Sequence, residues 1–327
     1  MSIRSPGAPE ALELVEAPEP APETGEVTID VAYAGVGFVD TLFRRGALPL
    51  PMPLTPGIEV SGHVRSVGAE VEGLEPGQPV AALLNDFVNL PGAGGYAEVA
   101  RARAALTIPL DVGADLADAA SVLVNGTTAW MALKELAHVE RGEDVLVLGA
   151  TGGLGGLLGQ LARKADAGRV IAAVGTASKR EAAERAGYTD VLVTDALAEG
   201  LKRVTGGRGV DAAFDPVGGD ARRVAFEGLA PLGRLVALGN ASGSDVSFAG
   251  DQIWLGSRAV IGLSVGGIAH LVPERVAAAA REVLGWTARR ELDVAPAAVL
   301  ALRDAAKAHR MLEGREITGK LVLGVSS

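Results

Sequence analysis

Short runs of alternating apolar and polar residues fill the first third of the chain. Glu26–Ala34 places Val27, Ile29 and Val31 on one face, which is typical of a half-buried strand. The same pattern predicts further short strands at Val60–Val67, Gln78–Leu84 and Tyr96–Val99. Glycine and proline pairs separate these runs and indicate turns. We therefore expect a small irregular β-barrel in this part of the chain.

The pattern changes near Asp115, where strands and helices begin to alternate. Two Ala-rich helices are expected first, at Asp115–Val122 and Thr127–Ala137. Asp144–Leu148 is a nearly continuous apolar run, as expected of a strand buried on both faces. Further strands are predicted at Val170–Val174, Asp190–Val193, Val210–Phe214, Arg234–Leu238 and Ala259–Val265, with helices at Gly152–Lys164, Lys179–Ala186, Ala196–Thr205 and Asp220–Leu229. This alternation indicates βαβ units and a parallel sheet.

The last part of the chain is predicted to hold two helices and a closing strand. The helices are expected at Pro273–Thr287 and Pro296–Leu312, and the strand at Gly319–Leu323. We expect this tail to return to the barrel domain. The parallel sheet would then be an insertion within that domain.

The composition suits two globular domains and argues against some binding partners. The chain has 327 residues, and its 48% of hydrophobic residues can fill two cores. Its net charge of −10 argues against a surface for nucleic acid or an anionic membrane. The sequence shows neither a signal peptide nor an apolar run of about 18 residues, so we expect a cytoplasmic protein.

The residue types that are missing limit the chemistry further. The sequence has no cysteine, which excludes thiolate nucleophiles and every zinc site with a sulfur ligand. Its four histidines form no closely spaced pair of the kind that a metalloprotease helix carries. We expect them on the surface or in loops rather than in catalysis. They are His63, His138, His270 and His309.

Residues 145–155 (VLVLGATGGLG) run from a buried strand through a glycine turn into a helix. Glycines let the backbone approach a pyrophosphate closely, and the helix N-terminus supplies amide donors. The spacing departs from G-x-G-x-x-G, so the strand before and the helix after carry the prediction. A strand–turn–helix without a ligand is the structural alternative. We expect a dinucleotide site that includes Gly152, Gly153, Leu154 and Gly155.

The end of the next strand bears on the choice of cofactor. An NAD-selective site usually has an acid there, which bonds the ribose 2′-OH. Here Gly175 follows the strand, and Ser178, Lys179 and Arg180 come next. A hydroxyl and two cations suit a 2′-phosphate, so we expect NADPH rather than NADH. An ordinary solvated basic helix start is the alternative.

Five segments together resemble a known family. They are Ala34–Thr41 (AGVGFVDT), Pro56–Gly62 (PGIEVSG), Ala150–Gly155 (ATGGLG), Asp215–Gly219 (DPVGG) and Thr318–Leu323 (TGKLVL). In this order they are similar to the zinc-free quinone oxidoreductases, the zeta-crystallin-like branch of the medium-chain dehydrogenase/reductase superfamily. The resemblance implies an α/β protein with a GroES-like β-barrel catalytic domain at 1–124 and 266–327. It places a Rossmann domain, a doubly wound parallel sheet that binds NADPH, at 125–265.

The resemblance also implies site residues. It assigns cofactor contacts to Thr128, Gly175, Gly239, Asn240 and Lys320. A helix cap at Thr128 and a plain turn at Asn240 are the structural alternatives.

Two departures from the family pattern bear on a metal site. Gly37 and Ile58 stand where the zinc-containing relatives have Cys and His, so no metal site is expected. Gly37 also replaces the Asn of the quinone reductases, and Glu59 is expected to be a structural turn residue. No catalytic residue is assigned.

Four residues are candidates for the substrate pocket: Phe38, Asp40, Phe43 and Tyr96. A capping role for Asp40 and a loop anchor at Tyr96 are equally compatible with the sequence. Trp254 is a further candidate for an apolar wall, although aromatic residues at such places more often belong to the core.

These observations predict an NADPH-dependent oxidoreductase that transfers hydride to a quinone or an α,β-unsaturated carbonyl without zinc. An enoyl or 2-alkenal reductase is an alternative within the same class. An NADPH-binding redox sensor or structural protein with little turnover is an alternative from another class. The expected partner is a small molecule, and the resemblance suggests a homodimer formed through the strand at Ala259–Val265.

Overall fold

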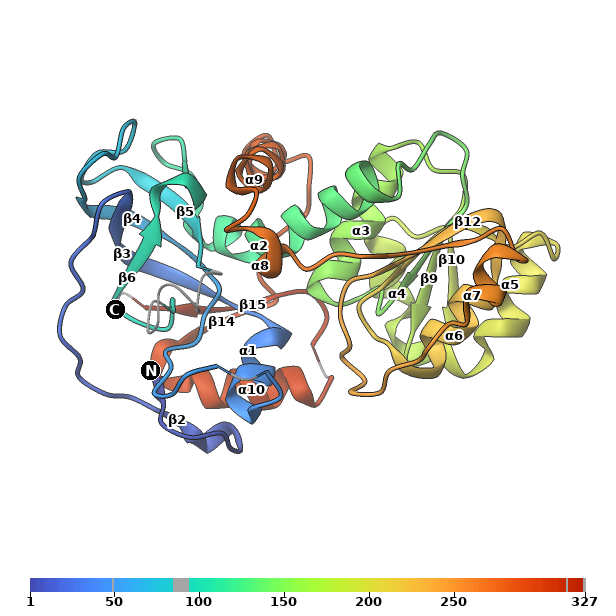
Figure 1. Cartoon of the computed structure of the whole chain (residues 1–327), viewed down its shortest axis with the longest axis horizontal. Helices are drawn as coiled ribbons and strands as arrows, with labels where there is room; N and C mark the ends of the chain where they lie inside the picture. Colours follow the sequence, from blue (N-terminus) through green and yellow to red (C-terminus); the bar gives the residue numbers. More distant parts are fainter. Residues whose placement is uncertain (49, 85–93, 316, 326–327) are drawn as a thin grey trace. The chain divides into compact units, whose positions relative to one another are not determined.

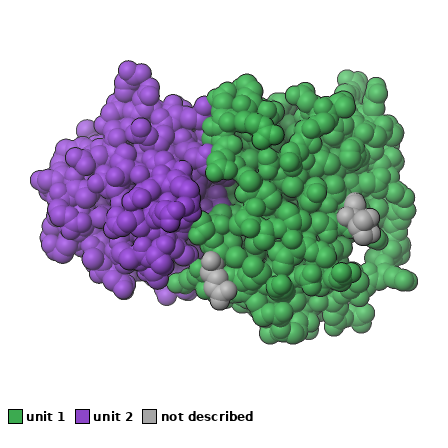
Figure 2. Space-filling model, turned by 180° about the vertical axis from the view of Figure 1, so that it is seen from behind, with its two compact units in different colours: residues 1–127, 265–327 green, residues 128–264 purple. Residues whose placement is uncertain are grey.

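The computed structural model describes residues 1–48, 50–84, 94–315 and 317–325, and it divides into two compact units (Figures 1 and 2). Unit 1 comprises Met1–Thr127 and Val265–Ser327, and unit 2 comprises Thr128–Ser264. The divisions thus fall three residues after the first expected boundary and one residue before the second. None of the helices in the described ranges is long and apolar enough to cross a membrane.

Unit 1 is built on a seven-stranded sheet in the order β14-β15-β3-β4-β5-β7, with β6 paired to β3. Its strands are β3 (Glu26–Val36), β4 (Glu59–Val67), β5 (Pro79–Leu83), β6 (Val99–Arg103), β7 (Thr107–Pro109), β14 (Ala298–Ala301) and β15 (Leu321–Gly324). The alternating side chains of Val27, Ile29 and Val31 are buried, as the sequence predicts. β15 pairs antiparallel with β3, so the C-terminal tail does return to the first sheet.

The other elements of unit 1 are short strands and helices. They are β1 (Ser2–Ile3), β2 (Leu12–Glu13), α1 (Phe38–Arg45), α2 (Leu116–Trp130), α8 (Val265–Ile268), α9 (Pro273–Ala288) and α10 (Ala305–Glu313). The residues of α2 extend past Thr127 into unit 2, where a π-helical segment, Met131–Leu136, follows. The two Ala-rich helices expected from the sequence are therefore continuous.

Two predicted elements of unit 1 are wrong. Pro296–Leu312 is not one helix, because Ala298–Ala301 pairs in parallel with β15 and the helix starts only at Ala305. Tyr96–Val99 is not a strand, because the strand starts at Val99 and Tyr96 lies in a turn, where its N–H donates to Pro56 O at 2.9 Å. In both places, pairing with distant segments overrides the local pattern.

Unit 2 is a six-stranded parallel sheet with helices between its strands. The strand order is β10-β9-β8-β11-β12-β13, which is 3-2-1-4-5-6 when counted within the unit and therefore doubly wound. The strands are β8 (Val145–Leu148), β9 (Val170–Val174), β10 (Asp190–Val193), β11 (Val210–Asp215), β12 (Leu229–Ala237) and β13 (Ala259–Gly262). The helices are α3 (Gly153–Lys164), α4 (Arg180–Arg185), α5 (Leu197–Thr205), α6 (Gly219–Glu227) and α7 (Gly250–Trp254).

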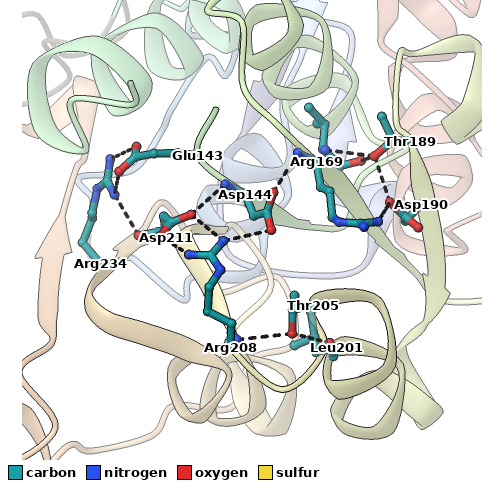
Figure 3. A network of polar contacts seen from close by, with 12 residues as sticks. Glu143, Asp144, Arg169, Thr189, Asp190, Leu201, Thr205, Arg208, Asp211 and Arg234 are labelled. Atoms are coloured by element: carbon teal, nitrogen blue, oxygen red, sulfur yellow. Dashed lines mark hydrogen bonds and ion pairs between the residues drawn. The ribbon is translucent and has the colours of Figure 1, made fainter. Parts of the chain in front are cut away.

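A network of charged residues lies at the amino-terminal ends of these strands (Figure 3). The Arg208 guanidinium contacts Asp144 at 2.9 Å and Asp211 at 2.7 Å. Arg234 donates to Glu143 Oε1 at 2.8 Å and to the Asp211 carbonyl at 2.9 Å. The network therefore joins the starts of β8 and β11 to Arg234 of β12.

Candidate active site

A glycine turn joins β8 to α3 at the carboxyl edge of the parallel sheet. Gly149 has a φ of +61°, and Gly152 is the N-cap residue of α3. A Cβ on Gly155 would lie 2.3 Å from Gly149 O, so only glycine lets the helix pack this closely against the turn. Because Gly152 has no side chain, no cap covers the first amides of the helix. This turn can therefore hold a pyrophosphate.

The residues predicted to bind a 2′-phosphate follow β9, which is the neighbour of β8. Gly175, Ser178 and Arg180 are exposed, and Lys179 is half-buried. Ser178 Oγ lies 2.9 Å from Thr176 Oγ1, within a short 3₁₀ turn at Ala177–Lys179. β8 and β9 are parallel neighbours, so this turn and the glycine turn lie at the same edge of the sheet. Together they fit the phosphates of a dinucleotide.

Two further loops follow β11 and β12 at the same edge. The Gly239–Asn240 segment lies after β12, and Asn240 Oδ1 accepts a hydrogen bond from Ser242 Oγ at 3.1 Å. A Cβ on Gly149 would lie 3.2 Å from Val217 Cγ2, so the turn after β11 is packed against the glycine turn. The structure thus brings most of the predicted cofactor residues to one edge of one sheet.

Lys320 and Thr128 do not lie in these loops. Lys320 is buried in unit 1, where its Nζ donates to Glu59 Oε1 at 2.5 Å. Glu59 Oε2 also accepts the Val124 N–H at 2.7 Å, so this ion pair connects β4, β15 and α2. Thr128 is buried on α2, one turn after Val124. The Lys320 ammonium is therefore engaged with Glu59.

Asp40 stabilises the start of α1. Its Oδ2 accepts the Gly37 N–H at 2.8 Å, and its Oδ1 accepts the Gly57 N–H at 2.9 Å. The carboxyl group is fully buried, which raises the pKa of Asp40 to about 6, although both amides and Lys320 oppose this shift. These contacts agree with the capping role and tie α1 to the turn before Glu59.

The aromatic candidates have different environments. Phe43 packs in a buried cluster with Leu54 and Ile58, whereas Phe38 is half-exposed. Tyr96 is fully buried, and its hydroxyl lies 3.2 Å from His309 Nε2. Trp254 is 66% exposed, so it does not belong to the core.

His309 corrects the expectation that all four histidines lie on the surface or in loops. It is fully buried on α10, whereas His63, His138 and His270 are exposed. Burial, together with the Arg44 charge, lowers the pKa of His309 to about 3, so the ring is neutral at pH 7. Its contact with Tyr96 makes it part of the core of unit 1.

In the part of the chain that the structure describes, the residues around Glu59 do not form a set of zinc ligands. Within the described ranges, no group of three or more His, Asp and Glu side chains is placed to hold a metal. Ile58 packs against Phe43 and Leu54, and the neighbouring Glu59 carboxylate is engaged with Lys320 and an amide. No zinc ligand set is assembled around Glu59.

The sequence did not single out Arg222 as a site residue. This side chain lies on α6, is only 8% exposed, and contacts both Asp215 and the Gly239 carbonyl. An arginine seven residues after an aspartate is too common a pattern to predict such a contact.

Comparisons with known proteins match both units. Residues 23–112 match the family described as "Alcohol dehydrogenase GroES-like domain", and residues 153–284 match "Zinc-binding dehydrogenase". The chain is 31% identical to a probable quinone oxidoreductase of Schizosaccharomyces pombe, over 99% of this chain and 96% of that protein. It is 29% identical to a 2-haloacrylate reductase of a Burkholderia species, over 98% and 97% of the two chains.

A comparison with a solved structure also identifies a quinone oxidoreductase as similar. The crystal structure of Escherichia coli quinone oxidoreductase complexed with NADPH aligns with a TM-score of 0.91 at 29% identity, and the alignment covers 99% of each chain. Unit 1 therefore contains a GroES-like domain, and unit 2 contains the Rossmann sheet. The chain belongs to the quinone oxidoreductase-like family of the medium-chain dehydrogenases/reductases.

Proposed function

We propose that this protein is an NADPH-dependent oxidoreductase that transfers hydride to a quinone or another α,β-unsaturated carbonyl without a metal ion. The observation that carries the proposal is the carboxyl edge of the parallel sheet in unit 2. There the glycine turn after β8 lies beside the cationic turn after β9. The E. coli relative solved with NADPH supports the choice of cofactor.

Different residues of unit 2 bind different parts of the cofactor. Amides at the start of α3 hold the pyrophosphate, and the absence of side chains at Gly152 and Gly153 leaves room for it. Ser178, Lys179 and Arg180 hold the 2′-phosphate by charge-assisted hydrogen bonds. The bound cofactor supplies the hydride, and the protein supplies position and hydrogen bonds.

The substrate class follows from the residues around Glu59. Oxidation of a simple alcohol requires removal of its hydroxyl proton, which zinc relatives assist by coordination. Ile58 and the Glu59–Lys320 pair provide no such ligand set. A quinone or enone accepts hydride at carbon, spreads the negative charge to its conjugated oxygen, and then takes one proton from water. The backbone N–H of Gly239 is the donor we assign to that oxygen.

Two alternatives remain distinct from this proposal. An enoyl or 2-alkenal reductase would use the same cofactor edge. The similarity to a 2-haloacrylate reductase is the observation that favours this alternative. A redox sensor or structural protein would bind NADPH with little turnover.

One experiment distinguishes the proposed function from the two alternatives. NADPH consumption is measured with quinones, enones, 2-alkenals and simple alcohols, and we expect turnover of the conjugated substrates only. A preference for 2-alkenals over quinones would select the first alternative. Binding of NADPH without turnover of any substrate would select the second.

We also propose a homodimer formed through β13. This strand is at the edge of the six-stranded sheet, and Val260 on it is 36% exposed. An edge strand offers backbone groups that a second copy can pair. Light scattering should give twice the chain mass, and Val260→Pro should reduce it to the mass of one chain, because proline removes a donor from the edge. A monomeric wild-type protein contradicts this assembly.

A further inference from the structure

Arg222 connects the two loops that follow β11 and β12. Its Nε donates to Asp215 Oδ2, and its Nη2 donates to the Gly239 carbonyl. Its Nη1 lies 3.1 Å from Asp245 Oδ1, at the exposed side of the same loop. The planar guanidinium thus uses three different nitrogens on three partners. A lysine ammonium cannot reproduce that geometry.

Asp215 binds both Arg222 and the turn after β11. It is fully buried, and its Oδ1 accepts the N–H groups of Val217 at 2.7 Å and Gly218 at 2.8 Å. One oxygen therefore shapes the turn after β11, and the other holds Arg222. A buried carboxylate needs such a partner, since an unpaired charge in the interior is strongly unfavourable.

The loop after β12 lies directly on this turn. Three backbone hydrogen bonds join them: Ala241 N–H to Pro216 O (3.1 Å), Ser242 N–H to Val217 O (2.8 Å) and Gly219 N–H to Ser244 O (3.0 Å). Gly218 has a φ of +80°, and a Cβ there would lie 2.3 Å from Asn240 Oδ1. The two loops therefore form one rigid platform.

Arg222 fixes one peptide group of this platform. The Gly239 carbonyl and the Asn240 N–H belong to the same planar trans peptide, so they point in opposite directions. Because Arg222 holds the carbonyl, the Asn240 N–H points away from the guanidinium. Within the described part of the chain this N–H donates to no protein acceptor. It is a donor of fixed direction on a half-exposed residue.

The position of the platform in the sheet indicates what this donor meets. β11 and β12 lie on one side of β8, and β9, which precedes the 2′-phosphate residues, lies on the other. A dinucleotide whose pyrophosphate lies at the glycine turn extends across this edge in both directions. The platform therefore faces the half of the cofactor that lies beyond the pyrophosphate from the adenosine.

We propose that Arg222 is a positioning residue, which aims the Asn240 amide at the nicotinamide half of NADPH through its hold on the Gly239 carbonyl. This inference rests on the proposed function, because it requires NADPH at the edge of the sheet. It adds a specific role for a buried side chain that does not itself contact the cofactor.

The test compares two ligands in Arg222→Lys. This variant keeps a positive charge beside Asp215 but loses the fork that reaches Gly239. Titration with NADPH should show binding weakened about tenfold, the equivalent of one hydrogen bond. Adenosine 2′,5′-bisphosphate has no nicotinamide, so its affinity should not change. Asp245→Asn is the matched control, since it removes only the exposed partner of Arg222, and both affinities should stay as in the wild type.

Each other outcome counts against the inference. Equal losses for both ligands in Arg222→Lys would mean a general structural role, and no loss for either would mean no role. A wild-type protein that binds adenosine 2′,5′-bisphosphate and NADPH equally well would leave the nicotinamide without a protein contact and overturn this inference alone. A wild-type protein that binds neither would overturn the proposed function as well.

Stability is controlled with a second variant. If Arg222→Lys does not fold, the double variant Asp215→Asn with Arg222→Gln removes both buried charges together, which avoids an unpaired ion. The same two titrations are then made, and the same selective loss for NADPH is expected.

Discussion

The two ends of the parallel sheet in unit 2 are built from different kinds of residue. At the amino ends, Arg208 and Arg234 connect strands through Asp144, Asp211 and Glu143 (Figure 3). These charged side chains satisfy one another. At the carboxyl ends of β8 and β9, glycines and exposed polar residues stand after the strands, and the backbone forms the surface.

This difference separates stability from binding within one sheet. Ion pairs at the amino ends hold neighbouring strands together without offering donors to a ligand. Glycine turns at the carboxyl ends bury little side chain but present amides, which suits a phosphate. The loops after β11 and β12 are an intermediate case, because a buried ion pair between Asp215 and Arg222 there supports backbone groups that are presented outward.

Substitution of Gly155 should have the largest effect on the carboxyl end of the sheet, where the cofactor is expected to bind. A Cβ at this position would lie 2.3 Å from Gly149 O and 2.7 Å from the Ala150 Cα, so Gly155→Ala must displace the turn. We expect unfolding free energy to fall by about 1–3 kcal/mol. Loss of two amide bonds to the pyrophosphate should weaken NADPH binding about a hundredfold. Urea denaturation and fluorescence titration measure the two effects.

Gly156→Ala is the matched control for that substitution. A Cβ on Gly156 would meet no atom within 4 Å, and alanine favours the helical conformation of α3. Its stability should equal or exceed that of the wild type, and NADPH affinity should be kept. If Gly155→Ala binds NADPH as Gly156→Ala does, the glycine turn is not the pyrophosphate site.

Substitutions in the cationic turn after β9 should weaken cofactor binding without changing the stability of the fold. Replacing Lys179 and Arg180 together by Ala removes the groups assigned to the 2′-phosphate. NADPH binding should weaken by about 1–3 kcal/mol, while NADH binding stays the same, so the preference between them disappears. Titration calorimetry with both cofactors measures this. Equal affinities for NADPH and NADH in the wild-type protein would refute the assignment.

The regular part of the fold could be predicted because its signals are local. Val170–Val174 and Asp190–Val193 have the predicted bounds, since buried parallel strands are continuous apolar runs between polar turns. Ala298–Ala301 was missed because alanine and leucine suit a helix equally well. Its strand depends on pairing with Leu321–Gly324, which lies far along the chain.

The site could be predicted only where the backbone makes it. Glycines after β8 are visible in the sequence because their spacing itself produces the turn. Lys320 and Glu59 are 261 residues apart, so the sequence could not show that they form a buried pair. Arg222 likewise needs Asp215 and Gly239, which belong to two different strand–loop junctions.

A substitution at the amino ends of the strands should have the smallest effect. It should lower the stability of the fold without changing NADPH affinity. Arg208 is half-exposed and contacts Asp144 and Asp211, so Arg208→Met removes ion pairs that solvent partly screens. We expect the unfolding free energy to fall by about 1 kcal/mol, and less at high salt, because salt screens such pairs in the wild type. NADPH affinity should not change, since the substitution is at the far end of the strands from the glycine turn. Urea denaturation at low and high salt, with a titration of each variant, tests this. A change in NADPH affinity larger than the change in stability would mean that the two ends of the sheet are coupled.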